Sequence, residues 1–396
     1  MRDAVTIDYP LEKMADNRRR MDARAKFRYH DRVPVGFCVV PRYFAPLFAL
    51  RYHELFRRVE TQFHWQLQFF KYRIENIPED IACHAPVVHV APYFDNVVNA
   101  SAFGAEIVWP ENETLHARPV IKTVEEMEHL EIPAPDAGLW GTVIEWWQRM
   151  TELARETKAI FNGIEGRVEV APLSIGGEGP HMIAIDLVGE DFYWWMLEYP
   201  EACHRFLRKI TLGMIQAERR FRELDPRPRG GYGIAEDSAQ IMSADLFVKF
   251  CVPYDNMLYD EFGAGLADGR GMHMCGDSRH LHRALVEHAR ISSFNVFGYQ
   301  VPPRTAAENL GGKLYLWGNV NPMLIRDGSQ EQVQAAAREC LEAMAPCGGF
   351  LLGDGANICP GTPLANLAVF TEAAQEYGVP PSVGDGPPTV PKPRSR

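Results

Sequence analysis

Helical segments alternate with short apolar strands over most of this chain, and that order of elements constrains the fold more than any other feature. Six segments are expected to form strands: residues 34–40, 229–236, 271–275, 293–298, 313–319 and 348–354. Four segments between or after them have helical patterns: residues 200–224, 243–262, 278–289 and 329–344. Such alternation is typical of an α/β protein with a parallel sheet.

From residue 229 onward the strands recur every few tens of residues, as the repeated units of a (β/α)8 barrel require. The 396 residues, 46% of them hydrophobic, can build one barrel-sized domain or two ordinary ones. No boundary signal divides the region, so we expect a single-domain TIM barrel over residues 34–378. Residues 1–33 are expected to form a helical N-terminal extension, and residues 379–396, rich in Pro and Gly, a disordered tail.

Charge and hydrophobicity exclude some partners. The formal net charge of −11 argues against nucleic acid, whose binding proteins concentrate Lys and Arg on one face. No stretch is apolar enough to span a membrane, and the N-terminus lacks the hydrophobic region of a signal peptide. We therefore predict a cytoplasmic protein. The eight cysteines are spread along the chain and are expected to be free thiols, some of them possible ligands.

The stretch GMHMCGD, residues 271–277, places a histidine and a cysteine two residues apart. In a strand, side chains alternate between the two faces, so His273 and Cys275 would point to the same side. Two metal ligands would then share one face. The alternative is that both are ordinary core residues, because free cysteine is among the most buried residue types.

Polar residues also follow other predicted strands. Asp237, Asn319 and Asp354 each lie at or just beyond a strand's carboxyl end, which is where a parallel barrel places its catalytic residues. This convergence favours a functional role for His273 and Cys275. Asp237 and Glu178 could serve as acid or base groups or as further ligands. The alternative for both is a solvated loop carboxylate.

Four segments together resemble the uroporphyrinogen decarboxylase superfamily, and especially its zinc-dependent methyltransferases that work with corrinoids. The segments are SADLFVKFCVPYDNML, GMHMCGD, LYLWGNVNPM and GGFLLGDGANICPGTPLANLAVF. The similarity runs from about residue 170 to residue 377 and is weaker upstream. It implies a (β/α)8 barrel, a zinc site and a methylated corrinoid as co-substrate.

The decarboxylases of this superfamily hold a substrate with many carboxylates through an arginine-rich motif near the N-terminus. The corresponding stretch here, VPVGFCVVPRYFAPLF, contains only Arg42. One guanidinium cannot neutralise several carboxylates, since each requires its own bidentate partner. The residues therefore argue against uroporphyrinogen decarboxylation.

The methyltransferases carry His-x-Cys on one strand and a second cysteine after the last strand. His273 and Cys275 match the first part, but Ala356 occupies the second cysteine's position. Asp354 and Cys359 are the nearest replacements, and zinc accepts either donor type. Asp354 is favoured because it directly ends the predicted strand, whereas Pro360 keeps Cys359 extended.

The sequence thus predicts a zinc-dependent methyltransferase with zinc on His273, Cys275 and either Asp354 or Cys359. Asp237, Glu178 and Asn319 are the candidate catalytic residues. The methyl group would pass between a small-molecule donor or acceptor and a corrinoid on a separate protein, because the chain contains no D-x-H-x-x-G motif.

Two alternatives remain at this point. The first is a metal-free decarboxylase or lyase of the same superfamily acting on a small carboxylate, with Asp237 orienting the substrate. The second is a non-catalytic binder of corrinoids or tetrapyrroles. No oligomeric state is predicted.

Overall fold

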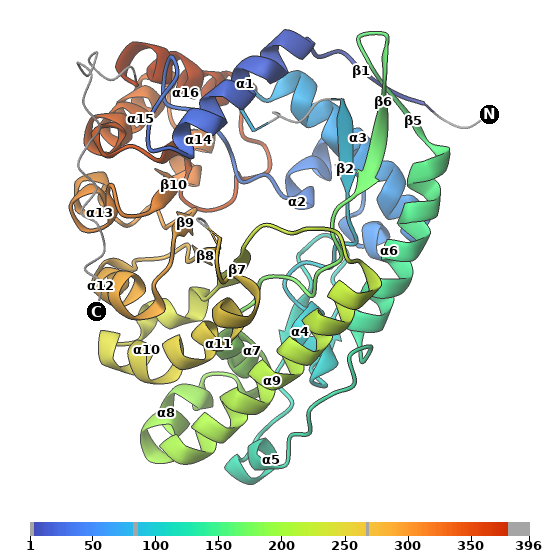
Figure 1. Cartoon of the computed structure of the whole chain (residues 1–396), viewed down its shortest axis with the longest axis vertical. Coiled ribbons are helices and arrows are strands. Elements are labelled where there is room, and N and C mark those ends of the chain that lie inside the picture. Colours follow the sequence, from blue (N-terminus) through green and yellow to red (C-terminus); the bar gives the residue numbers. More distant parts are fainter. Residues whose placement is uncertain (1–3, 82–85, 267–268, 379–396) are drawn as a thin grey trace.

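The computed structural model describes residues 4–81, 86–266 and 269–378 (Figure 1). A parallel, curled sheet lies in the C-terminal half, with its five strands in the order β11-β10-β9-β8-β7. Its strands are Tyr232–Ala235 (β7), Arg270–His273 (β8), Ser293–Asn295 (β9), Tyr315–Val320 (β10) and Phe350–Asp354 (β11). Each overlaps a strand expected from the sequence, so the predicted α/β class with parallel strands is confirmed. The predicted tail at 379–396 lies outside the described residues.

Single bridges lengthen this sheet at both ends. Val35 pairs in parallel with Leu352 of β11, and Glu178 pairs in parallel with Ala235 of β7. The predicted strand 34–40 is therefore reduced to one bridged residue, although it takes the expected place beside the last strand.

A second sheet has the order β1-β5-β6-β2. Its strands are Val5–Ile7 (β1), Val87–Val90 (β2), Lys158–Phe161 (β5) and Ile164–Val170 (β6). β5 and β6 form an antiparallel hairpin, to which β1 and β2 add in parallel. The N-terminal segment thus supplies a strand besides helix α1, Leu11–Arg24. A short antiparallel pair, Glu106–Val108 (β3) with His116–Arg118 (β4), lies apart.

Helices lie around the five-stranded sheet (Figure 1). The longest, α9, covers Pro200–Leu224, as its sequence pattern predicts. Proline suits its first turn, where an N–H would have no partner. Residues at helical spacing, such as Phe206, Ile210 and Met214, are buried on one face. Helix α15, Gln330–Met344, begins with a capping box in which Ser329 and Gln332 bond each other's backbone.

The predicted helix 243–262 is wrong in one respect, because it is broken at Cys251. It forms two helices, α10 (Ala244–Phe250) and α11 (Val252–Phe262). Pro253 has no N–H to donate and its ring obstructs the preceding turn, so one continuous helix cannot form. The segment 278–289 is also irregular, with a 3-10 turn, a short α12 (His282–Ala284) and a π-turn over Leu285–Ala289.

The remaining helices are short to medium in length. They are Pro41–Phe44 (α2), Val59–Asn76 (α3), Val98–Ala102 (α4), Val124–Glu128 (α5), Leu139–Glu156 (α6), Pro180–Val188 (α7), Asp191–Glu198 (α8), Pro303–Leu310 (α13), Pro322–Asp327 (α14) and Leu364–Tyr377 (α16).

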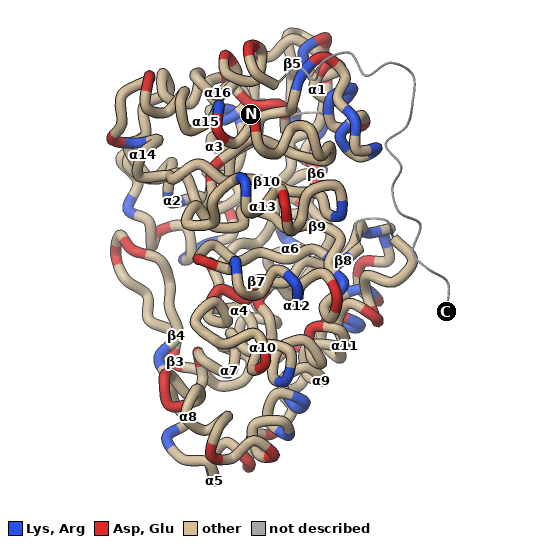
Figure 2. The backbone as a smooth tube through the Cα atoms, turned by 90° about the vertical axis from the view of Figure 1, so that its left-hand side faces the viewer, with Lys and Arg blue, Asp and Glu red and all other residues tan. Residues whose placement is uncertain are grey.

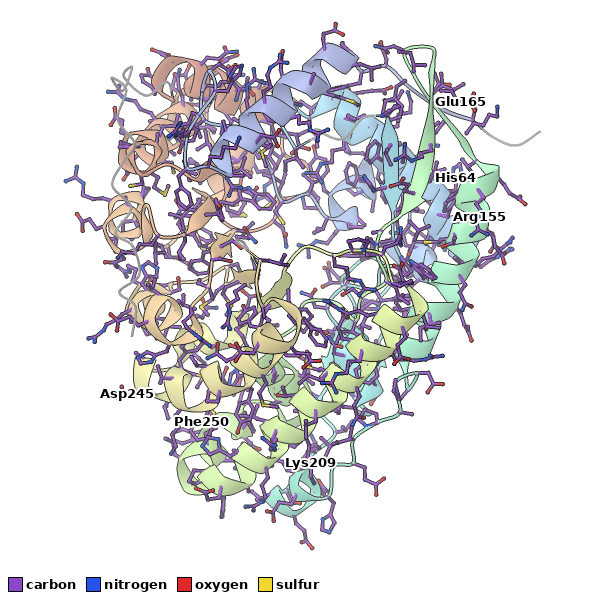
Figure 3. All side chains as sticks on the ribbon, viewed as in Figure 1. His64, Arg155, Glu165, Lys209, Asp245 and Phe250 are labelled. Carbon is purple, nitrogen blue, oxygen red and sulfur yellow. The ribbon has the colours of Figure 1, made fainter. Side chains whose placement is uncertain are left out.

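Side chains fill the space between the helices and the sheets (Figure 3). The larger core includes Phe294 of β9, Leu316 of β10 and Phe206 of α9. A smaller core includes Val88 of β2 and Leu67 of α3. Lys and Arg are interspersed with Asp and Glu along the backbone in Figure 2. Within the described part of the chain, no helix combines the length and the apolar character needed to cross a membrane.

Candidate metal centre

The carboxyl ends of β7 and β8 bring three potential metal ligands together. The two strands pair in parallel with Ala235 opposite His273. Asp237 and Cys275 each follow two residues later. In parallel strands of matched register, residues equally far beyond the paired positions lie at similar heights. The pairing of the strands therefore places the Asp237 carboxylate beside the Cys275 thiol.

The ligand atoms of Asp237, His273 and Cys275 all lie within 4.8 Å of one another. Nε2 of His273 is 3.6 Å from Oδ1 of Asp237. All three residues are partly exposed. Nitrogen, sulfur and carboxylate oxygen together form a donor set that zinc binds.

A hydrogen bond from the neighbouring strand orients the His273 ring. Nδ1 of His273 lies 2.9 Å from the backbone carbonyl oxygen of Asn295, the last residue of β9. A carbonyl oxygen only accepts, so Nδ1 carries the proton and donates it. In the neutral ring, Nε2 on the side of Asp237 then has the free lone pair. Metal-binding histidines are typically held in this way by their second nitrogen.

Asp237 is the charged group that most affects the ionisation of the Cys275 thiol. Its backbone N–H donates a 2.7 Å hydrogen bond to Oδ1 of Asp237. Burial and, next, the negative charge of Asp237 raise the pKa of the Cys275 thiol to about 12. A divalent cation would reverse this effect, because it stabilises both the thiolate and the carboxylate.

The structure does not bring Asp354 or Cys359 into this group. Asp354 ends β11 as expected, but its side chain is fully buried. Its Oδ1 accepts a 2.8 Å hydrogen bond from the backbone N–H of Cys38, its Oδ2 has no partner, and burial raises its pKa to about 8. Cys359 lies in the following loop, with Sγ 3.7 Å from Sδ of Met323. Both remain predictions as ligands.

The other two candidate catalytic residues are buried. Glu178 accepts hydrogen bonds from the backbone and side-chain nitrogens of Asn99, at 3.2 and 3.0 Å, and burial raises its pKa to about 8. Asn319 donates through Nδ2 to the carbonyl oxygens of Gly298 and Val301, at 2.9 and 2.7 Å. Neither residue joins the three ligands, and both hold the backbone around the sheet.

The family model for uroporphyrinogen decarboxylase (URO-D) matches residues 88–377, which is most of the chain. The chain belongs to the uroporphyrinogen decarboxylase family. The match includes all of β7 to β11 and therefore the three clustered ligands. The resemblance inferred from the sequence motifs is thus confirmed.

Two curated relatives carry different activities in their names. A uroporphyrinogen decarboxylase of Danio rerio is 24% identical over 196 residues, which are 46% of this chain and 49% of the relative. Methylcobamide:CoM methyltransferase MtaA of Methanosarcina barkeri is 26% identical over 217 residues, which are 52% of this chain and 58% of the relative. The chain thus spans about half of the length of the curated relatives it matches.

A solved structure shares the overall fold. A methyltransferase from Methanosarcina mazei superposes with a TM-score of 0.65 at 21% identity, covering 91% of this chain and 99% of that one. At this level of identity the similarity establishes the fold of this family member, and the fold alone.

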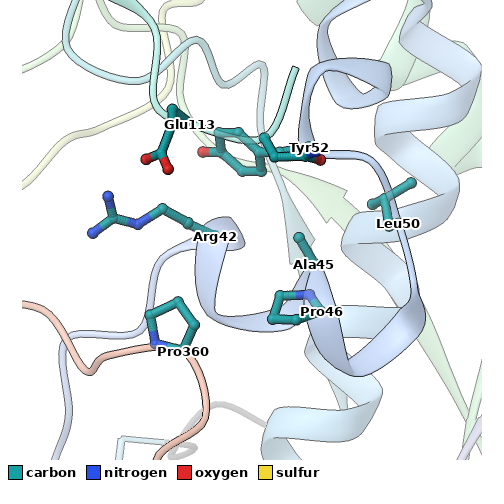
Figure 4. A pocket seen from close by; sticks show the side chains of 8 residues that line it. Arg42, Ala45, Pro46, Leu50, Tyr52, Glu113 and Pro360 are labelled. Carbon is teal, nitrogen blue, oxygen red and sulfur yellow. The ribbon is translucent and has the colours of Figure 1, made fainter. Parts of the chain in front are cut away.

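A pocket lies between the loop that follows β11 and the segment around α2 (Figure 4). Its lining includes Arg42, Leu50, Tyr52, Glu113 and Pro360. Arg42 is the single arginine that the sequence offered for binding a carboxylate substrate. The pocket therefore presents one guanidinium together with one carboxylate, which does not suit a ligand with many negative charges.

The sequence left Asp237 open as an acid or base or as a further ligand, and favoured Asp354 or Cys359 as the third ligand beside His273 and Cys275. The predicted strands 229–236 and 271–275 did not give the contact of Asp237 with His273 and Cys275, because it depends on the register that sets Ala235 opposite His273.

Proposed function

We propose that this chain is a metal-dependent methyltransferase with a zinc centre formed by Asp237, His273 and Cys275. The gathering of these three ligand atoms within 4.8 Å is the observation that carries the proposal. The methyl group would pass between a small-molecule donor or acceptor and a corrinoid carried by a separate protein. The similarity to a methylcobamide:CoM methyltransferase supports this choice of reaction.

The three side chains fit a catalytic zinc rather than a structural one. Catalytic zinc sites have three protein ligands and an open fourth position, whereas structural sites are closed. The partial exposure of Asp237, His273 and Cys275 leaves room for a fourth ligand from solution. Bound zinc would supply Lewis-acid chemistry, lowering the pKa of a thiol or polarising the heteroatom of a methylated substrate.

The residues of the chain perform the positioning. The Asn295 carbonyl keeps the proton of His273 on Nδ1, so Nε2 faces the centre. The Cys275 N–H holds Oδ1 of Asp237, which fixes the carboxylate beside the thiol. A methylcorrinoid would supply the methyl group without its bonding electrons, which would stay with the corrinoid, and the lone pair of the acceptor heteroatom would form the new bond.

A closed (β/α)8 barrel over residues 34–378 belongs to the same proposal. The bridges of Val35 with Leu352 and of Glu178 with Ala235 extend the five-stranded sheet by one backbone segment at each edge. A sheet that closes into a barrel must be extended by further neighbours at both edges in this way. The cytoplasmic location remains a prediction.

Metal analysis combined with a transfer assay tests the function. Protein purified without metal-affinity steps is assayed with free methylcobalamin and 2-mercaptoethanesulfonate (CoM), following the cobalamin absorption. We expect bound zinc and thiol-dependent demethylation. Cys275→Ser should lose the zinc of this centre and the activity while keeping the fold. Cys347→Ser changes another partly exposed cysteine outside the group and should retain both.

The same assay separates the competing ligands and the competing function. Asp237→Ala should reduce zinc affinity at least tenfold, by analogy with the cost of disturbing a zinc site's supporting groups, while Asp354→Ala should not. The opposite order would restore Asp354 as the third ligand. Active protein without zinc, or release of carbon dioxide from a small carboxylate, would instead support the metal-free decarboxylase or lyase.

A further inference from the structure

A second group of potential ligands lies inside the molecule, separate from the half-exposed centre. The ligand atoms of His181, Glu236 and Cys251 also lie within 4.8 Å of one another. His181 comes from α7, Glu236 from the end of β7 and Cys251 from the break between α10 and α11. Solvent reaches 1% or less of each residue. The three donors thus lie close together in the interior, away from bulk solvent.

Several polar atoms in this group have no hydrogen-bond partner. Oε2 of Glu236 is buried without one, yet it faces Nδ1 of His181 at 3.7 Å. The hydroxyl oxygen of Ser238 lies 3.1 Å from the same nitrogen, and Nε2 of His181 is buried and unpartnered. Buried polar groups in native proteins are almost always paired, so each exception requires an explanation.

Asp255 of α11 adds a second carboxyl group. It is fully buried. Its carboxyl group and that of Glu236 can share a hydrogen bond when one of them carries a proton, whereas two ionised carboxylates would leave both oxygens of Asp255 without a partner. Across residues 4–81, 86–266 and 269–378, no lysine or arginine forms an ion pair with either carboxyl group. A single proton shared between Glu236 and Asp255 would still leave one oxygen of Asp255 without a partner.

We propose that His181, Glu236, Cys251 and Asp255 form a second, closed site for a divalent transition-metal cation of the zinc type. Tetrahedral zinc with bonds of roughly 2.0 to 2.3 Å holds its ligand atoms about 3.3 to 3.8 Å apart. Nδ1 of His181 and Oε2 of Glu236 are 3.7 Å apart, a few tenths of an ångström more than the roughly 3.3 Å that zinc sets between a nitrogen and an oxygen ligand. The Cys251 thiol lies within 4.8 Å of the ligand atoms of both residues, and Asp255, which is not part of this group, would have to turn toward it.

A closed site of four ligands has no position for substrate, so its role is structural. The cation would join α7, the end of β7 and the junction of α10 with α11. Because Glu236 immediately precedes Asp237, this connection would hold the backbone that carries the first centre's carboxylate. The break between α10 and α11 would then have a function, because Cys251 at the break is the residue that supplies the thiol to this site.

Zinc content measured per chain, without reference to activity, tests the second site. Full-length protein is expressed with zinc and purified without metal-affinity steps. We expect two zinc ions in the wild type, one in Cys275→Ser, one in Cys251→Ser and none in the double variant. Cys203→Ser, which alters another fully buried cysteine, should keep two. In cobalt-substituted Cys275→Ser, the thiolate-to-cobalt absorption band should come from Cys251 of the second site. Adding Cys251→Ser to this variant should remove the band.

The outcomes distinguish this site from the proposed function. If the wild type binds one zinc ion per chain, and this ion is retained in Cys275→Ser but lost in Cys251→Ser, the result would support the buried site and refute the exposed one. A Cys275→Ser protein that is folded but free of zinc would overturn the buried site without any change to its residues. If Cys251→Ser does not fold, Glu236→Gln replaces it, and unchanged zinc content in that variant would also overturn the proposal.

Discussion

Glu178 offers a sharp test of how burial controls ionisation in this fold. Its carboxyl group is 4% exposed and bonded to Asn99, and burial raises its pKa from 4.5 to about 8. Glu178→Gln keeps an oxygen for Asn99 but removes the charge at every pH. The pKa of Glu178 is higher in the folded protein than in the unfolded one, so the wild type is most stable when this carboxyl group is protonated. That contribution to stability is complete below about pH 4.5 and is lost as the pH rises through about 8.

The size of the effect follows from the two pKa values. One pKa unit corresponds to about 1.4 kcal/mol. Apart from a constant difference between Gln and protonated Glu, the free energy of unfolding of the variant should therefore exceed that of the wild type by less than about 1 kcal/mol at pH 5, about 3 kcal/mol at pH 7 and about 5 kcal/mol above pH 8.5. These values are upper estimates, because relaxation around a buried charge reduces its cost.

Urea denaturation at pH 5, 7 and 9 measures this difference. Glu145→Gln, an exposed position on α6, is the matched control and should change the free energy of unfolding by less than about 0.5 kcal/mol at each pH. A gap between Glu178→Gln and the wild type that does not grow with pH would refute the reasoning. It would show that Glu178 is ionised in the folded protein, as a catalytic base would be.

Three further outcomes are expected. Trp140→Phe removes the indole N–H that donates 2.9 Å to Oδ1 of Asn99, and the unpaired buried oxygen should cost about 1–3 kcal/mol in urea unfolding. Asp80→Asn weakens the paired hydrogen bonds of 2.6 and 3.0 Å from Arg32; it should cost about 3–5 kcal/mol, as for a broken buried ion pair, and an unchanged unfolding midpoint would contradict this. Dialysis against a chelator should remove zinc from the half-exposed centre within hours while the buried ion remains until the protein is unfolded, as metal analysis of each fraction would show.

The sequence predicted the C-terminal strands well because each has a local signature. Residues 348–354, for example, are apolar up to a terminal aspartate, and β11 ends at Asp354 as that pattern indicates. The long helix α9 was equally clear, since its apolar positions recur over seven turns. The break at Cys251 was readable from Pro253 alone, but the periodicity of residues 243–262 concealed it.

The candidate site depended on information that no single segment contains. His273 and Cys275 were found from their spacing, whereas the position of Asp237 beside them follows from strand order and register. The buried group of His181, Glu236 and Cys251 joins three elements from separate parts of the chain. Such contacts are set by how helices pack on the sheet, which local patterns do not encode.

The parallel register of Ala235 with His273 has a consequence for protein engineering. All three donors of the exposed centre lie within two residues of a strand end, so the sheet, and not the loops beyond it, sets their mutual positions. Loops beyond the 3-10 helix Asp237–Ile241 and beyond Cys275 can then be lengthened or exchanged to reshape the surroundings of the donors while the donors stay in place. The fold thereby separates the part that performs chemistry from the part that selects a substrate, and libraries confined to those loops would vary only the second.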